Sequence, residues 1–159
     1  MKTAKRFLFA ALCSVLAAGY AQTPRKKSPP PAQAVPTPVS FDVLVYGATP
    51  AGIGAALNAA ELGHRVALVE PTARIGGMVT NGLSLTDIIS LESVSGFFKQ
   101  YADRAHRHYV QAYGADSPQA RDCFFGMLTE PKVSLHVFRE MLAERPNVTV
   151  YTQHRLHTV

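Results

Sequence analysis

The sequence predicts an α/β fold with parallel strands. Three segments support this class: a short apolar run at 43–46, a helical segment rich in small residues at about 51–62, and a second apolar run at 66–69. Continuous apolar runs of this length are typical of strands that are buried on both faces of a parallel sheet. A strand, a helix and a strand in this order predict a βαβ unit, in which the helix connects two parallel strands.

The segment from Gly47 to Gly52, called the first bend below, has the spacing of a Rossmann-like dinucleotide-binding turn. Gly47 ends the first apolar run, Gly52 follows five residues later, and Ala56 lies one helical turn further on. In such turns the first glycine permits the tight bend. The later small residues let the helix lie close to the strand and to a pyrophosphate at the helix N-terminus. Gly63 predicts a left-handed C-cap that ends the helix.

One part of the first bend departs from the usual G-x-G-x-x-G pattern. Thr49 stands in place of the middle glycine, and its Cβ lies where the backbone normally approaches the ligand. Pro50 fits the first helical position, because its missing N–H would have no partner there. The turn of short-chain dehydrogenases fits less well. That turn has glycines at its first, fifth and seventh positions, whereas Gly47, Gly52 and Gly54 occupy the first, sixth and eighth. For the glycine pattern alone, simple helix–sheet packing remains an alternative.

An acid ends the second strand. Glu70 lies 18 residues after Gly52, close to the roughly 20-residue offset of the acid that accepts hydrogen bonds from the adenosine ribose. A carboxylate at this position would also repel a 2′-phosphate. Glu70 is therefore predicted to bind the ribose of a dinucleotide.

A second glycine-rich loop follows at 74–82. Its paired glycines, Gly76 and Gly77, are called the double-glycine bend below. Backbone N–H groups in such a bend can reach a second side of a diphosphate, and Arg74 can add charge-assisted hydrogen bonds. A plain nicotinamide domain does not need this loop, so its presence favours a flavin dinucleotide. A flexible surface loop is the alternative interpretation.

These segments resemble the start of bacterial FAD-dependent oxidoreductases. Within them, the chain is most similar to an often exported group whose members are sometimes labelled xanthan-lyase-like. The resemblance covers 41–159, and in that group a threonine in place of the middle glycine is ordinary. It implies FAD as cofactor, and later segments that complete the cofactor domain and cover the isoalloxazine ring. The segments that carry it are 45–53, Glu70–Pro71, Ile75–Met78 through Gly82, Thr86–Asp87, 130–133, 137–142 and 148–150.

The resemblance and the motifs together predict an FAD-binding segment of a flavin-dependent oxidoreductase whose substrate is unknown. The fold class is a Rossmann-like FAD/NAD(P)-binding βαβ unit that is incomplete at the C-terminus. This segment alone is expected to be inactive, and its catalytic residues cannot be assigned. The alternative is a truncated, non-catalytic fragment that binds at most the ADP part of a dinucleotide. The predicted cofactor-binding residues are Gly47, Thr49, Pro50, Ala51, Gly52, Glu70, Arg74, Gly76, Gly77 and Met78.

The N-terminal 40 residues predict export and a linker. Residues 1–21 have a basic start, an apolar run and a small-residue cleavage site, as in a signal peptide. The apolar run is too short to span a bilayer, so a membrane anchor is the weaker alternative. Residues 22–40 are proline-rich and basic, which predicts an extended linker. We expect a periplasmic or secreted protein, and the choice between Sec and Tat export stays open.

The charge distribution argues against nucleic-acid binding. Of the 16 Lys and Arg residues, six precede residue 41, whereas all 11 Asp and Glu residues follow it. The predicted domain at 41–159 therefore carries 10 basic and 11 acidic residues and has no basic excess. Cys123 is the only cysteine after the predicted cleavage site, and it is interpreted as a buried thiol.

The remainder of the chain predicts two helices and a strand. An amphipathic helix with an aromatic stripe is expected at 93–113, where Gly114 ends it. A loop follows at 115–132, then a helix at 134–144 and a strand at 147–152. The aromatic stripe is interpreted as core. No metal site is predicted, because His106 and His108 point to different sides of a helix, and His136 has no partner at ligand spacing.

Overall fold

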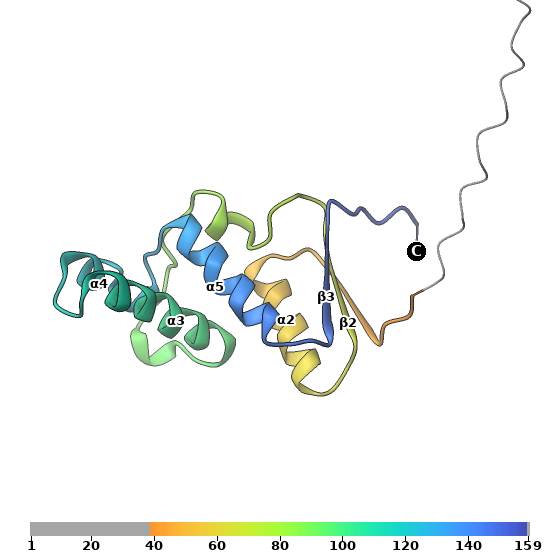
Figure 1. The fold of residues 1–159 in the computed structure, drawn as a ribbon, viewed down its shortest axis with the longest axis horizontal. Coiled ribbons are helices and arrows are strands. Elements are labelled where there is room, and N and C mark those ends of the chain that lie inside the picture. Colours follow the sequence, from red (N-terminus) through yellow and green to blue (C-terminus); the bar gives the residue numbers. More distant parts are fainter. Residues whose placement is uncertain (1–38, 159) are drawn as a thin grey trace, which may run out of the picture. The chain divides into compact units, whose positions relative to one another are not determined.

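A parallel three-stranded sheet organises residues 39–158, the part of the chain that the computed structural model describes (Figure 1). The strands are β1 (Val43–Tyr46), β2 (Val66–Glu70) and β3 (Val148–Thr152), in the order β1-β2-β3. Both strand pairs are parallel, which confirms the predicted α/β class. The predicted signal peptide at 1–21 and all but the end of the predicted linker at 22–40 lie outside the described residues.

Helix α2 (Pro50–Glu61) connects β1 to β2 and completes the predicted βαβ unit. Its buried side includes Ile53 and Ala56, which are both fully inaccessible to solvent. The helix ends at Glu61 with Leu62 as its C-cap, and Gly63 follows with a φ of +89°, the left-handed conformation that the sequence predicts. The small residues of α2 therefore hold the helix against the sheet, as their pattern indicates.

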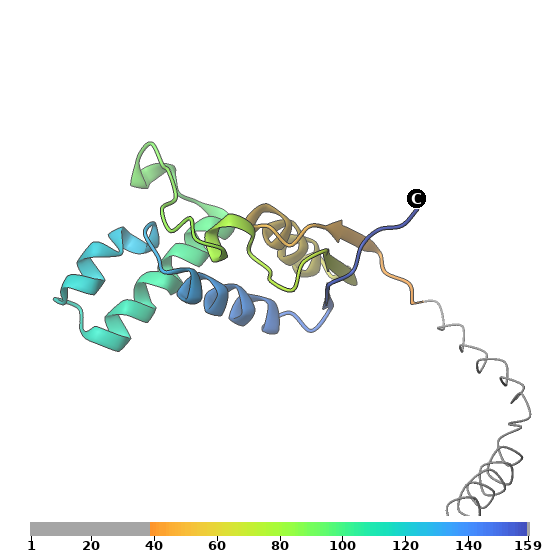
Figure 2. The ribbon, with the colours of Figure 1, turned by 90° about the horizontal axis from the view of Figure 1, so that it is seen from above.

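Three further helices lie beyond α2: α3 (Gly96–Tyr113), α4 (Pro118–Asp122) and α5 (Pro131–Ala143). Figures 1 and 2 show α2 and α5 on one side of the sheet, with α3 and α4 farther from the strands. Tyr101 of α3 and Phe138 of α5 are buried, and their ring centroids lie 4.8 Å apart. The aromatic stripe of α3 is thus mainly core, although Tyr113 at its end is half exposed.

A buried triangle of hydroxyl groups ties α3 to α5. The Tyr101 hydroxyl lies 2.9 Å from Thr129 Oγ1 and 2.7 Å from Ser134 Oγ, and these two oxygens lie 2.7 Å apart. Since each hydroxyl has one proton to donate and lone pairs to accept, the three groups can satisfy one another without water. The sequence analysis missed this network, because hydrophobic periodicity carries no signal from buried polar residues.

Several predicted boundaries were wrong. The long helix begins at Gly96 rather than at residue 93, because a separate 3-10 turn, η2 (Leu91–Ser93), precedes it. The predicted loop at 115–132 contains α4 and a further 3-10 turn, η3 (Phe124–Gly126). The last helix begins at Pro131, not at residue 134. Pro118 and Pro131 were interpreted as loop residues, whereas each occupies the first position of a helix, where a missing N–H costs nothing.

The sheet face opposite the helices is uncovered in the described part of the chain. Leu44 and Tyr46 of β1 point to this face and are 57% and 48% exposed. They line a hollow of about 340 Å³ together with other largely apolar residues, among them Val69, Tyr151 and Leu156. Among the described residues, β1 and β3 each pair on one edge only. An apolar surface of this kind is typical of a face that another element covers.

Within residues 39–158, none of the helices combines the length and the apolar character needed to cross a membrane.

Candidate functional site

The first bend owes its shape to two glycines. Gly47 follows β1 with a φ of +99°, a conformation that glycine adopts without strain. At Gly52, an added Cβ would lie 1.9 Å from the carbonyl oxygen of Gly47. Only glycine therefore allows the first turn of α2 to lie this close to the end of β1. This is the physical basis of the five-residue spacing between the two positions.

The start of α2 has few free amide donors. Pro50 has no N–H, and the Gly52 N–H donates to Thr49 Oγ1 at 3.2 Å. The Ile53 N–H donates to the Thr49 carbonyl at 2.8 Å. In the described part of the chain, Ala51 is the first-turn residue whose N–H has no acceptor. The first turn itself contains no acidic residue.

The double-glycine bend is in direct contact with the first bend. The Gly76 N–H donates to the Ala48 carbonyl at 2.6 Å. An added Cβ at Gly77 would lie 3.4 Å from Pro50 Cδ and 3.5 Å from Thr49 Cα, which is van der Waals contact. The structure thus brings together two glycine-rich segments that lie far apart in the sequence.

The double-glycine bend is itself more ordered than the predicted loop. Residues Gly77–Thr80 form a 3-10 turn, η1. The buried Thr80 hydroxyl donates to the Ile75 carbonyl at 2.6 Å. An added Cβ at Gly76 would lie 2.2 Å from Thr80 Cγ2, so the packing of this turn requires glycine there. The segment is thus a hydrogen-bonded turn and not a loop without regular structure.

Glu70 is buried and bound to the backbone of both neighbouring segments. The residue is 7% exposed, and its carboxylate oxygens accept hydrogen bonds from the Ala48 and Thr72 N–H groups, each at 2.9 Å. Burial raises the pKa of this carboxyl, but the hydrogen bonds from Thr72 and Ala48 outweigh burial, so the pKa lies below its usual value. The ionised carboxylate has about four acceptor positions, of which these contacts use two.

This arrangement gives Glu70 a role that the sequence analysis missed. By accepting from Ala48, the carboxylate holds the first bend in place, in addition to any contact with a ligand. The sequence spacing pointed to a ligand contact alone, because it carries no information on which backbone groups the side chain meets.

The other predicted residues lie beside the two bends. Arg74 and Met78 are exposed, Met78 at 72%. Within residues 39–158, Arg74 has no acidic partner within salt-bridge distance. Its backbone is fixed by Thr72, whose hydroxyl accepts from the Arg74 N–H at 3.2 Å and donates to the Arg74 carbonyl at 3.0 Å. The guanidinium is therefore free to meet an anion.

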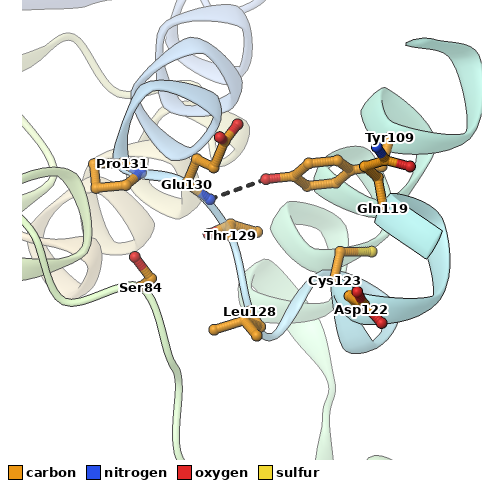
Figure 3. A pocket seen from close by; sticks show the side chains of 9 residues that line it. All are labelled: Ser84, Tyr109, Gln119, Asp122, Cys123, Leu128, Thr129, Glu130 and Pro131. Carbon is orange, nitrogen blue, oxygen red and sulfur yellow. Dashed lines mark hydrogen bonds between the residues drawn. The ribbon is translucent and has the colours of Figure 1, made fainter. Parts of the chain in front are cut away.

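A separate cavity of about 300 Å³ lies between α3, α4 and the start of α5 (Figure 3). The Tyr109 hydroxyl projects into it and accepts a hydrogen bond from the Glu130 N–H at 2.9 Å. Burial raises the pKa of Tyr109. None of the residues predicted to bind a cofactor lines this cavity, and no sequence motif pointed to it.

Cys123 borders the same cavity. It is buried, as predicted, and its Sγ lies 3.3 Å from His106 Nδ1. The rings of His108 and His136 also lie close together, with centroids 5.7 Å apart. These contacts join different helices, which spacing along the sequence cannot indicate. Within residues 39–158, no three His, Cys, Asp or Glu side chains form a group that fits a metal ion.

A βαβ unit with a glycine-shaped first turn, an acid at the end of the second strand and a second glycine bend against the first defines a dinucleotide-binding domain. The chain belongs to the FAD dependent oxidoreductase family, whose family model matches residues 42–159. The cofactor of this family is FAD. The structure fits this cofactor, because the close approach at Gly52 leaves the end of α2 bare and its Ala51 N–H without an acceptor.

Curated relatives match a shorter segment. The chain is 54% identical over 41 residues to a soluble pyridine nucleotide transhydrogenase from Hahella chejuensis (strain KCTC 2396), covering 26% of this chain and 9% of the relative. The protein of the same name from Marinomonas sp. (strain MWYL1) is 49% identical over 41 residues, with the same coverage. The chain thus spans about a tenth of the length of these relatives, 9% in each case.

Two solved structures are similar to the chain at a low level. Histamine dehydrogenase from Rhizobium sp. 4-9 matches with a TM-score of 0.38 and 20% identity, covering 78% of this chain and 13% of that chain. The HOCl-induced flavoprotein disulfide reductase RclA from Escherichia coli matches with a TM-score of 0.36 and 19% identity, covering 69% and 21%.

Proposed function

We propose that the first bend, the double-glycine bend and Glu70 together bind the ADP part of FAD. The contact between the two bends carries this proposal, because it supports a single site for one diphosphate. The first bend offers the N-terminus of α2, and the double-glycine bend adds a second set of backbone groups beside it. The exposed Arg74 supplies positive charge.

Each predicted residue has a defined part in this proposal. The glycines allow close approach, Glu70 accepts hydrogen bonds from the ribose hydroxyls, and Arg74 faces a phosphate. Bound FAD supplies the hydride-transfer chemistry of the enzyme, while these residues bind and orient its nucleotide half. The proposed cofactor-binding residues are Gly47, Thr49, Pro50, Ala51, Gly52, Glu70, Arg74, Gly76, Gly77 and Met78.

A thermal melt of the 159-residue chain with ADP or riboflavin tests the site. We expect ADP to raise the melting temperature and riboflavin, which has no diphosphate or adenosine, to leave it unchanged. A ligand at 100 times its Kd stabilises a folded protein by about 2.7 kcal/mol, which such a melt resolves. Stabilisation by riboflavin but not by ADP would contradict the proposal. A melting temperature that neither ADP nor FAD raises would contradict it as well.

We further propose that additional residues of the same polypeptide cover the apolar face of the sheet. The exposure of Leu44 and Tyr46 supports this, as does the greater length of the relatives. The alternative, a fragment that binds only the ADP part, is supported by the same uncovered face. Two measurements on a protein extended by the downstream codons separate these possibilities. If the added residues cover the face, the extended protein should bind FAD more tightly than ADP, and it should no longer bind an apolar dye. The fragment alternative predicts equal Kd values for FAD and ADP.

We propose that the protein is exported and belongs to the group labelled xanthan-lyase-like. The basic and apolar segments of residues 1–21 support export, and the resemblance of 41–159 supports the group. N-terminal sequencing of protein recovered from the periplasm or medium of an expressing bacterium should find Gln22 as the first residue. Recovery of the intact N-terminus, in the cytosol alone, would contradict export.

A further inference from the structure

We propose that the Thr49 hydroxyl donates a hydrogen bond to a phosphate group of FAD, and so replaces the backbone donor that Pro50 lacks. This inference rests on the proposed ADP site and assigns one residue within it. It explains why a side chain stands where the dinucleotide-binding pattern has its middle glycine.

The number of available donors supports a role for a side chain. A helix N-terminus has four N–H groups without a partner inside the helix, which it can offer to an anion. In α2, Pro50 has no amide hydrogen, and the Gly52 N–H is already directed to Thr49. Among the described residues, this leaves the Thr49 and Ala51 N–H groups as the free donors at the start of the helix. A phosphate at this helix would therefore meet fewer backbone donors than usual.

The position of the Thr49 hydroxyl supplies the missing donor. Thr49 Oγ1 accepts from the Gly52 N–H at 3.2 Å, so the oxygen lies over the N-terminus of α2. Accepting that bond uses a lone pair of the oxygen and leaves the hydroxyl hydrogen to be donated. Within the described part of the chain, this hydrogen has no acceptor. It is thus available to a phosphate in front of the helix.

The surroundings of Thr49 hold the hydroxyl in this orientation. An added Cβ at Gly77 would lie 3.5 Å from Thr49 Cγ2, so the methyl group is close to the double-glycine bend. The methyl and the hydroxyl therefore have different neighbours, the first against Gly77 and the second on the Gly52 amide. A threonine can satisfy both contacts.

Three variants of Thr49 test the assignment through the Kd of ADP, measured by calorimetry on the 159-residue chain. Thr49→Gly removes the hydroxyl, restores the usual middle glycine and keeps a residue that is tolerated at a helix N-cap. We expect ADP to bind at least about ten-fold more weakly to this variant, since a hydrogen bond to a charged group is lost. Thr49→Ser keeps the hydroxyl and should bind within about three-fold of the wild type. Thr49→Val should match Thr49→Gly.

A control variant at another helix N-cap separates an effect on helix stability from an effect on phosphate binding. Ser117 caps α4 in the same way, with its Oγ accepting from the Ala120 N–H at 3.1 Å, and it belongs to neither bend. Ser117→Ala should lower the melting temperature and leave the Kd of ADP unchanged. Equal or tighter ADP binding by Thr49→Gly would overturn the assignment of the hydroxyl alone. Failure of the wild type to bind ADP would instead overturn the proposed site, and the two results are distinct.

Discussion

Gly52→Ala is expected to lower the free energy of unfolding by about 3 kcal/mol and to abolish ADP binding. The added Cβ would lie 1.9 Å from the Gly47 carbonyl oxygen, a distance that no rotamer can relieve because the contact is with backbone. Overpacking of a well-packed site typically costs about 1–3 kcal/mol, and backbone clashes fall at the upper end. The helix must move away from β1, which separates the two bends. Urea denaturation followed by circular dichroism measures the stability, and calorimetry measures ADP binding.

An exposed residue of the same helix provides the control. Ala55→Ser changes a residue on the solvent side of α2 and adds one oxygen atom. Its effect should stay within about 0.5 kcal/mol, as is usual for surface substitutions. If Gly52→Ala were as stable as Ala55→Ser and bound ADP normally, the close approach of α2 to β1 would not exist.

Glu70→Gln is expected to cost about 1–3 kcal/mol of stability at neutral pH, before any ligand is added. The carboxylate accepts from two backbone N–H groups, and the amide nitrogen of glutamine would face one of them donor to donor. This cost reflects the anchoring of the first bend and differs from the ribose contact. Urea denaturation without ligand at pH 7 measures it directly.

The pH dependence of stability gives a second signature of Glu70. Its pKa is lower in the folded chain than its usual value of 4.5. The stabilisation is therefore complete above that value and is lost as the pH falls through the lower, folded-state pKa. The wild type should lose this stability below about pH 4.5, whereas Glu70→Gln should lack that component.

A second acid serves as the control for this signature. The pKa of Glu144 is also lowered, by its hydrogen bonds to Arg104, but Glu144 is far more exposed than Glu70. Exposed ion pairs contribute only about 0–1 kcal/mol. Glu144→Gln should therefore alter the acid dependence much less than Glu70→Gln. Equal effects of the two substitutions would show that Glu70 does not anchor the first bend.

Loss of the Glu70 carboxylate should also weaken FAD binding. Glu70→Ala leaves the ribose hydroxyls without an acceptor, which corresponds to about 1–3 kcal/mol in affinity. Because the same substitution loosens the first bend, the affinity has to be compared with that of a variant of equal stability. Unchanged affinity would remove Glu70 from the cofactor site.

Those parts of the fold that depend on local sequence were predictable. Gly47, Gly52 and Gly63 each have a backbone conformation or a close contact that only glycine allows. The βαβ unit can therefore be recognised in the sequence from the spacing of these glycines. The apolar runs of β1 and β2 likewise mark a parallel sheet. The position of Glu70 at the end of β2 was predictable for the same reason, although its partners were not.

Features that depend on contacts between distant segments were not predictable. Tyr101 lies about 30 residues before the neighbouring pair Thr129 and Ser134, and nothing in their local patterns indicates that the three hydroxyls meet. Phe124 and Phe125 adopt positive φ values of 45° and 54°. Bulky residues rarely adopt this conformation, so the sequence gives no reason to expect it here. Pro118 and Pro131 start helices, although proline more often marks a loop in a sequence.

Nuclear magnetic resonance of the 159-residue chain titrated with ADP tests the central claim most directly. If one diphosphate lies between the first bend and the double-glycine bend, the amide signals of Ala51, Gly52, Gly77 and Met78 should shift together with a single Kd. Shifts confined to one of the two bends would contradict a shared site. Shifts centred on Tyr109 and Glu130 would place the nucleotide in the separate cavity and contradict the account as a whole.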